Sequence, residues 1–161
     1  MLDPQGRWDF GAGSKVLELA RSGKGRAPYI LTATEPAREK TEVLEAAGGR
    51  FIRIEVQRVG DGESRVEWRE VLRVLSAEGL RSVMIEGGGT VINSLLRPEN
   101  SALVNSVILT IAPTWLGVGG VVVSPPRRLD EGGKPVAAAR LHHVQWHPLG
   151  EDVIMCGKLI T

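Results

Sequence analysis

The sequence predicts an α/β fold, with a mixed sheet flanked by helices and an antiparallel hairpin at its C-terminal end. Three observations support this prediction. Up to about residue 96, helical and extended patterns alternate, which is typical of parallel strands whose connecting helices cover the sheet faces. After that point, extended patterns predominate. The last two extended segments are separated by a short, turn-rich connector, HPLGE, which favours an antiparallel hairpin.

The first half of the chain alternates between apolar stripes of helical spacing and short apolar or alternating runs. Gly23, Gly48 and Gly79 follow three of the expected helices, and glycine is a common helix stop. The polar stretch QRVGDGES, residues 57–64, is expected to form a surface loop. The expected helices span residues 14–22, 36–47, 66–78 and about 90–96, and the expected strands span residues 28–32, 51–56 and 82–86.

The second half is expected to contain three strands, at residues 102–112, 139–146 and 152–160. A loop, PTWLGVGG, follows the first of them, and a polar insert rich in glycine and proline spans residues 124–134. We expect a single domain over residues 1–161, because this length suits one ordinary hydrophobic core.

Composition narrows the classes of function. Twenty basic and nineteen acidic side chains give a net charge of +1, which provides no global attraction to nucleic acid or to a membrane surface. The sequence has no run of 18 apolar residues, and its first residues lack the layout of a signal peptide. A single cysteine, Cys156, excludes an internal disulfide and a C-x-x-C site. We therefore expect a soluble intracellular protein.

The stretch SVMIEGGGTVINSLL, residues 82–96, is the strongest candidate for chemistry. A strand that leads through Gly87, Gly88 and Gly89 into a helix directs free backbone amides and the positive end of the helix dipole at whatever lies above the strand end. The absence of side chains would let a phosphate approach the main chain. The motif is neither G-x-G-x-x-G nor a P-loop. A tight strand-to-helix turn without a ligand is the alternative.

Glu86 ends this expected strand, so its carboxylate would project toward the same space. It could accept a hydrogen bond from a sugar hydroxyl or an amine, or it could cap the helix that follows. Asn93, one turn into the helix, is a weaker candidate of the same kind. In the next loop, Trp115 could stack on a ring or fill an edge of the core, and Asn105 could pair at an interface or simply end a strand.

The histidines invite a metal interpretation. On a regular strand, His143 and His147 would share one face, with His142 opposite. No acidic pair nearby completes a set of three or four ligands. We therefore predict no metal site.

Several stretches together resemble the riboflavin-pathway pyrimidine reductases, which correspond to the C-terminal reductase domain of bifunctional deaminase–reductases. The resemblance is strongest to the fungal and archaeal form that stands alone. The stretches that carry it are SVMIEGGGTVINSLL, LDPQGRWDF, PYILTATEP, NSVILTIAPTWLG, VVSPP and DVIMCGKL.

The resemblance implies a dihydrofolate-reductase-like fold and a cytoplasmic oxidoreductase, expected to be a homodimer. Such enzymes use NADPH to reduce the ribosyl group of 2,5-diamino-6-ribosylamino-pyrimidinone 5′-phosphate to ribityl. The resemblance further implies that Glu86 contacts the substrate and that Thr32 or Thr34 borders the cofactor. The segment implied to surround the cofactor phosphates consists of Gly87, Gly88, Gly89, Thr90, Val91, Ile92 and Asn93.

The chain departs from the family pattern at its start, where LDPQGRWDF resembles the middle of the family domain. Family members begin with a further segment that includes a strand with a T-x-S-x-D-G-like motif, a helix, and a G-x-G-T-x-x-x-D-x-P stretch. Without it, part of the substrate pocket would be missing, and we expect exposed apolar surface and pairing with another chain. A non-catalytic paralogue that keeps the fold, with or without nucleotide binding, and acts only in association with another chain is therefore the alternative function.

Overall fold

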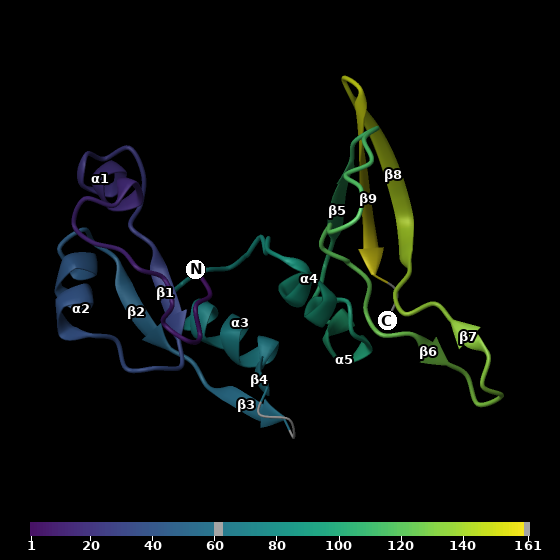
Figure 1. Cartoon of the computed structure of the whole chain (residues 1–161), viewed down its shortest axis with the longest axis horizontal. Helices are drawn as coiled ribbons and strands as arrows, with labels where there is room; N and C mark the ends of the chain where they lie inside the picture. Colours follow the sequence, from purple (N-terminus) through teal and green to yellow (C-terminus); the bar gives the residue numbers. More distant parts are fainter. Residues whose placement is uncertain (60–62, 160–161) are drawn as a thin grey trace. The chain divides into compact units, whose positions relative to one another are not determined.

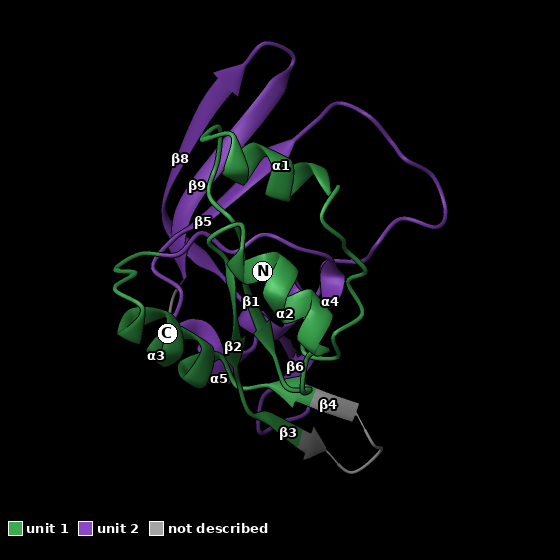
Figure 2. Ribbon diagram, turned by 90° about the vertical axis from the view of Figure 1, so that its left-hand side faces the viewer, with its two compact units in different colours: residues 1–82 green, residues 83–161 purple. Residues whose placement is uncertain are grey.

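Both features that the sequence predicts, a parallel strand pair and a C-terminal antiparallel hairpin, occur in the computed structural model of the chain (Figure 1). The structure describes residues 1–59 and 63–159. The chain divides into two compact units, Met1–Ser82 and Val83–Thr161, which Figure 2 shows in different colours.

The first unit is built around the parallel pair β1 and β2. The register runs from Tyr29 opposite Arg50 to Thr32 opposite Arg53. Leu2 forms an isolated parallel bridge to Leu31. The elements of this unit are α1 (Lys15–Arg21), β1 (Tyr29–Thr32), α2 (Arg38–Glu45), β2 (Arg50–Arg53), β3 (Val56–Val59), β4 (Glu63–Val66) and α3 (Trp68–Ala77).

Three helices of the first unit lie where their apolar stripes predict. In α2, Leu44 is fully buried, as the stripe requires. In α3, Trp68, Val71 and Leu75 are buried, and the Glu67 carboxylate caps the helix by accepting a hydrogen bond from the Arg69 amide at 2.9 Å. All three helices are followed by the predicted glycines with positive φ, Gly23, Gly48 and Gly79.

The core of this unit lies between the helices and the parallel pair. It consists of Phe10, Leu17, Ile30 and Leu44, with Trp8, Val43, Ala47 and Phe51 packed against it.

The segment after β2 differs from the prediction. The strand expected over residues 51–56 ends at Arg53, and the expected loop 57–64 contributes to an antiparallel pair in which Val56 lies opposite Val66 and Val59 opposite Glu63. Residues 60–62 of that loop lie outside the described residues. In the sequence, Asp61-Gly62 stands between two alternating runs, which is a hairpin signal. This signal predicts the observed strand pairing, whereas the polarity of the stretch indicated a loop.

The strand expected over residues 82–86 is absent: residues 81–88 have no regular secondary structure. Val83 and Met84 are exposed, by 41% and 77%. An apolar run forms a strand only when its amides and carbonyls pair with a neighbouring strand. No strand of the described part of the chain pairs with this run, and the prediction was therefore wrong here.

The second unit contains a three-stranded antiparallel sheet in the order β5–β9–β8. The hairpin prediction is confirmed, but its turn is shorter than expected. Only Gly150 and Glu151 separate the strands, because His147, Pro148 and Leu149 extend β8 and pair with β9. Gly150 has φ +62°, which suits a tight turn. The elements are α4 (Gly89–Leu95), α5 (Pro98–Ser101), β5 (Val107–Ile111), β6 (Arg128–Leu129), β7 (Pro135–Val136), β8 (Leu141–Leu149) and β9 (Asp152–Leu159).

Strand β5 is shorter than the predicted run of residues 102–112, because the short helix α5 and a turn precede it. Pro98 at the start of α5 suits the first helical turn and is the sequence signal for this helix. Within the polar insert, Asp130 accepts hydrogen bonds from the Gly132 and Lys134 amides, both at 2.9 Å, between the paired strands β6 and β7.

Strand β8 contains an irregularity that overturns the expected arrangement of the histidines. His142 pairs with Lys158 and Gln145 with Cys156, so one extra residue is accommodated between them, where His143 has φ 50°. His147 pairs with Ile154. Because Ile154 and Lys158 are four residues apart on β9, His142 and not His143 shares the face of His147.

The tightest glycine in the first unit is Gly49, between α2 and β2. A Cβ atom there would lie 2.6 Å from the Pro28 carbonyl oxygen and 2.6 Å from Leu44 Cδ1. The Pro28 oxygen belongs to the main chain beside β1, so it cannot move aside as a flexible side chain would. We expect Gly49→Ala to lower the free energy of unfolding by about 1–3 kcal/mol, as overpacking does. Gly13→Ala is the control, because its Cβ would contact nothing. Equal stabilities of the two variants in urea denaturation would contradict the packing described here.

Candidate functional site

The candidate segment runs from Glu86 to Asn93 in the second unit. It consists of irregular residues 86–88 and the first part of helix α4 (Figure 1). Gly88 is the N-cap residue, and the first amides that donate to its carbonyl are those of Val91 and Ile92, at 3.1 and 3.2 Å. By the geometry of an α-helix, the amides of Gly89 and Thr90 have no acceptor within the helix. The predicted helix start is therefore confirmed, although the strand that should precede it is not present.

The three glycines have three different surroundings. A Cβ at Gly87 would lie 3.2 Å from the Val91 Cβ, which is a tight contact with a side chain. A Cβ at Gly89 would lie 2.6 Å from Val121 Cγ1 and 3.0 Å from the Val122 carbonyl oxygen. At Gly88 a Cβ would meet nothing within 4 Å, and its φ of −71° is open to any residue. Packing thus accounts for Gly89 and partly for Gly87, whereas no contact within the chain requires a glycine at position 88.

Asn93 fixes a distant segment against α4. Its Nδ2 donates to the Val122 carbonyl oxygen at 2.9 Å, next to the place where Val121 contacts Gly89. The Asn93 Oδ1 atom is buried and has no hydrogen-bond partner among the described residues. The sequence pattern singled out Asn93 but not its partners, because a contact across 29 residues leaves no periodic signal.

The Glu86 side chain is exposed. Within residues 1–59 and 63–159, its carboxylate makes neither a hydrogen bond nor an ion pair. The capping alternative therefore has no support in this structure, where the N-cap position of α4 is Gly88. Glu86 remains available to an external donor.

Thr32 and Thr34 belong to the first unit, at the end of β1. Thr32 is buried, and its hydroxyl lies 3.1 Å from the Thr34 hydroxyl and accepts from the Thr34 amide at 3.3 Å. A Cβ at Gly6 would lie 2.9 Å from the Thr34 Oγ1. The two threonines thus form a local pair of hydroxyl groups, and the backbone of Gly6 lies beside this pair.

The other candidate residues from the sequence do not form a binding or metal site with other described residues. Trp115 is 95% exposed, so it does not fill an edge of the core of the described structure. Asn105 is exposed just before β5. The rings of His142 and His143 lie 4.5 Å apart. In the described part of the chain, no three histidine, cysteine, aspartate or glutamate side chains are placed to share a metal ion.

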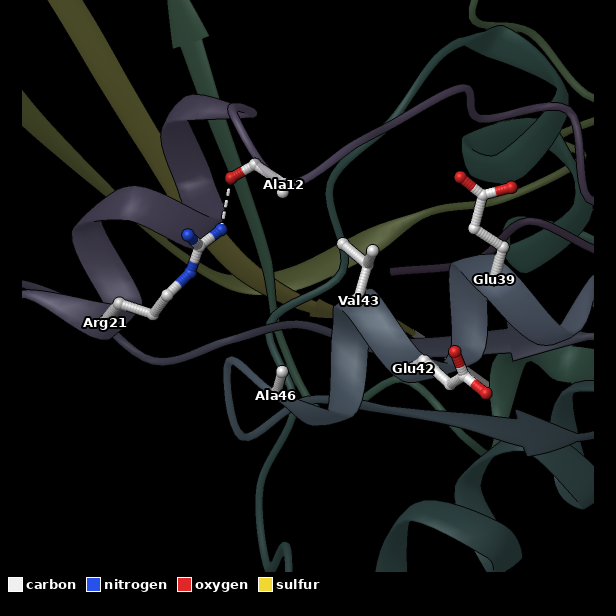
Figure 3. A pocket seen from close by; sticks show the side chains of 6 residues that line it. All are labelled: Ala12, Arg21, Glu39, Glu42, Val43 and Ala46. Atoms are coloured by element: carbon white, nitrogen blue, oxygen red, sulfur yellow. Dashed lines mark hydrogen bonds between the residues drawn. The ribbon is translucent and has the colours of Figure 1, made fainter.

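A hollow of about 300 Å³ lies in the first unit between α1 and α2 (Figure 3). Arg21 donates to the Ala12 carbonyl on one side, and Glu39 and Glu42 lie on the other. Glu42 already pairs with Arg38 at 2.8 Å. None of the predicted site residues lines this hollow, and its lining consists of Ala12, Arg21, Glu39, Glu42, Val43 and Ala46.

A search of the described residues for a helix long and apolar enough to cross a membrane finds none.

Sequence comparison finds fungal relatives that share one name. Proteins of Debaryomyces hansenii and Eremothecium gossypii, both named 2,5-diamino-6-ribosylamino-4(3H)-pyrimidinone 5′-phosphate reductase, are 34% and 37% identical to it. Each alignment covers 99% of this chain but 59% and 56% of the respective relative. The chain therefore spans little more than half the length of these curated relatives.

Structure comparison agrees. The solved structure of the riboflavin biosynthesis reductase Rib7 of Saccharomyces cerevisiae matches with a TM-score of 0.74 at 30% identity, covering 99% of this chain and 68% of the other. A RibD structure from Acinetobacter baumannii matches with a TM-score of 0.66 at 19% identity, over 99% of this chain and 36% of the other, which supports the fold alone. These neighbours confirm the predicted mixed α/β, dihydrofolate-reductase-like fold.

The family model described as the RibD C-terminal domain matches residues 3–155, nearly the whole length of the sequence. Together with the fungal relatives and the Rib7 structure, this match shows that the chain belongs to the RibD C-terminal domain family.

Proposed function

We propose that the chain carries out the NADPH-dependent reduction of 2,5-diamino-6-ribosylamino-pyrimidinone 5′-phosphate, in which the ribosyl group becomes ribityl. Membership of the RibD C-terminal domain family and the names of the fungal relatives support the reaction class. The observation that carries the proposal is the closeness in sequence of an exposed carboxylate, Glu86, which has no partner among the described residues, and the bare backbone at Gly88.

The residues at the start of α4 fit the phosphates of a nicotinamide dinucleotide. At Gly88 the space that a Cβ would occupy is free, and the first amides of a helix favour anions. Gly87, Gly88, Gly89 and Thr90 would contact the phosphates in this proposal. Val91, Ile92 and Asn93 follow in the same helix, and Asn93 supports the site by holding Val122.

When bound, the nicotinamide supplies the hydride, and the protein supplies position and charge. The Glu86 carboxylate would accept a hydrogen bond from the substrate's sugar hydroxyl or amine and so orient the carbon that is reduced. Because this carboxylate makes no bond within the described chain, no internal contact has to break before it does so. Thr32 and Thr34 would border the cofactor through their hydroxyl pair.

A second candidate function lacks catalysis. The chain aligns with 59% and 56% of the length of the first fungal relatives. A non-catalytic protein that keeps the fold, with or without nucleotide binding, and acts only in association with another chain is the alternative. Turnover distinguishes the two candidates.

Pure, folded chain should oxidise NADPH in the presence of the ribosylaminopyrimidine phosphate, followed by the loss of NADPH absorbance. Glu86→Gln should lower kcat about 10–100-fold, the range expected when one hydrogen bond to a charged group is lost. Its Kd for NADPH should stay within about twofold, because the carboxylate faces the substrate. Absence of turnover in the wild-type chain would overturn the catalytic proposal and favour the alternative.

Gly88→Val tests the phosphate contacts separately from the fold. The Cβ atom of a valine at this position would meet no other atom within 4 Å, and the residue needs no unusual backbone angle. Valine is a poorer N-cap residue than glycine, so we expect the variant to lose about 1 kcal/mol of stability and to stay folded. Its side chain would fill the space proposed for phosphate, and we expect no measurable NADPH binding by fluorescence titration. Gly11→Val, at another open glycine, is the matched control and should bind normally. Normal binding by Gly88→Val would refute the assignment of these amides.

We also propose that the chain acts as a homodimer in the cytoplasm. The support for a dimer is strand β5, which pairs with β9 on one side and with no other strand of the described chain. Its residues Ile108, Leu109 and Ile111 are exposed by 61%, 46% and 43%. Light scattering should give twice the chain mass of 17.4 kDa. A monomer at micromolar concentration would refute the dimer.

A further inference from the structure

A second cavity lies in the second unit, at the end of α4 and separate in sequence from the segment 86–93. Its volume is about 210 Å³. Small-molecule pockets usually measure about 300–1,000 Å³, so this cavity suits a small group and not a whole cofactor. The residues that line it are Arg97, Pro98, Glu99, Pro125, Pro126, Arg127, Arg128 and Ala138.

The charged residues of its lining are mostly basic, in a chain whose overall charge is nearly balanced. Three arginines and one glutamate are among the lining residues, so basic side chains exceed acidic ones by two, whereas the whole chain carries +1. Arginine is the side chain best suited to bind planar or tetrahedral anions through paired N–H groups. Guanidinium groups close to one small cavity repel one another, and an anion between them would relieve that repulsion.

Arg97 provides the second, independent observation. Its Nε atom is buried and has no hydrogen-bond partner among the described residues. The nearest carboxylate oxygen, Glu99 Oε1, lies 4.0 Å from Arg97 Nη1, which is too far for a hydrogen bond. The side chain as a whole is 29% exposed. Buried N–H groups are nearly always paired, and Arg97 Nε–H is an exception among the described residues.

The backbone around the cavity is held by its own contacts. Asn100 donates through Nδ2 to the Ser94 carbonyl at 2.9 Å, which ties α5 to α4. Arg128 pairs with Val136 in the strand pair β6–β7. The consecutive prolines Pro125 and Pro126 restrict the chain that presents Arg127 and Arg128. The arginines are therefore attached to restrained backbone and not to an open loop.

We propose that this cavity is a binding site for a phosphate dianion, either free phosphate or the phosphate group of a phosphorylated sugar. The charge of a phosphate monoester, about −1.5 to −2 at pH 7, matches the excess of two positive charges. The guanidinium groups of Arg97, Arg127 and Arg128 would donate hydrogen bonds to the phosphate oxygens. The site differs from the one proposed at Gly88, which relies on main-chain amides.

Binding is measured with inorganic phosphate and, separately, with ribose 5-phosphate, by isothermal titration calorimetry and by the side-chain Nε–H signals of arginine in nitrogen-15 spectra. We expect saturable binding that shifts the Arg97 Nε–H signal. Tighter binding of ribose 5-phosphate would identify a phosphorylated sugar as the ligand, and equal binding would identify free phosphate. No saturable binding of either ligand to the wild-type chain would overturn the proposal.

Arg97→Gln should weaken binding at least about tenfold, as expected for the loss of one hydrogen bond between charged groups. The double variant Arg127→Gln/Arg128→Gln alters only exposed side chains and provides the same test if Arg97→Gln fails to fold. Arg69→Gln, at an exposed arginine of α3, is the control and should bind as the wild type does. Gly88→Val should also retain phosphate binding. Unchanged affinity in both arginine variants, or loss of binding in Gly88→Val, would overturn the proposal.

Discussion

Backbone pairing decides which apolar runs of this chain become strands. Every buried backbone amide and carbonyl needs a hydrogen-bond partner. The composition of an apolar run does not show whether a partner strand lies beside it. The run Tyr29–Thr32 pairs with β2, and Leu31 also bridges to Leu2, so β1 is well defined. The run of residues 82–86 is equally apolar but pairs with no strand of the described residues and stays irregular. Strand β5 is intermediate, because β9 is its one partner among the described strands.

The start of α4 depends on a different constraint, the close approach of a second segment. Gly89 lets Val121 and the main chain of Val122 lie against the first turn, and Asn93 ties the same segment down through a hydrogen bond of 2.9 Å. These contacts hold the helix start in place without using Gly88. The backbone at Gly88 therefore stays bare while its neighbours are packed, as a site for close anion approach requires.

Much of the fold could be predicted because its signals are local. The helices follow apolar stripes and glycine stops, and the C-terminal hairpin follows alternation on both sides of Gly150. The failures depend on distant or cooperative contacts. The missing strand before Glu86 lacks a partner, and the extra residue near His143 changes a face assignment that assumed regular pleating.

The candidate site was predictable to a similar extent. Three consecutive glycines after a carboxylate are visible in the sequence, and they mark the segment correctly as the start of a helix. Which glycine serves packing and which leaves space depends on Val121 and Val122, about 30 positions further along the chain. The arginine-lined cavity was not predicted at all, because Arg97 and Arg127 come from separate parts of the sequence and neither forms a motif.

Strand β5 also affects how the protein behaves in concentrated solution. Residues 106–112, SVILTIA, contain no charge, no proline and no glycine, and the strand exposes apolar side chains along an edge that no other described strand covers. Segments of this composition, when exposed at an edge, add strands from other molecules and lead to aggregation. Whatever covers this edge in the cell therefore also protects the chain's solubility, and a preparation without that cover should lose soluble protein as its concentration rises.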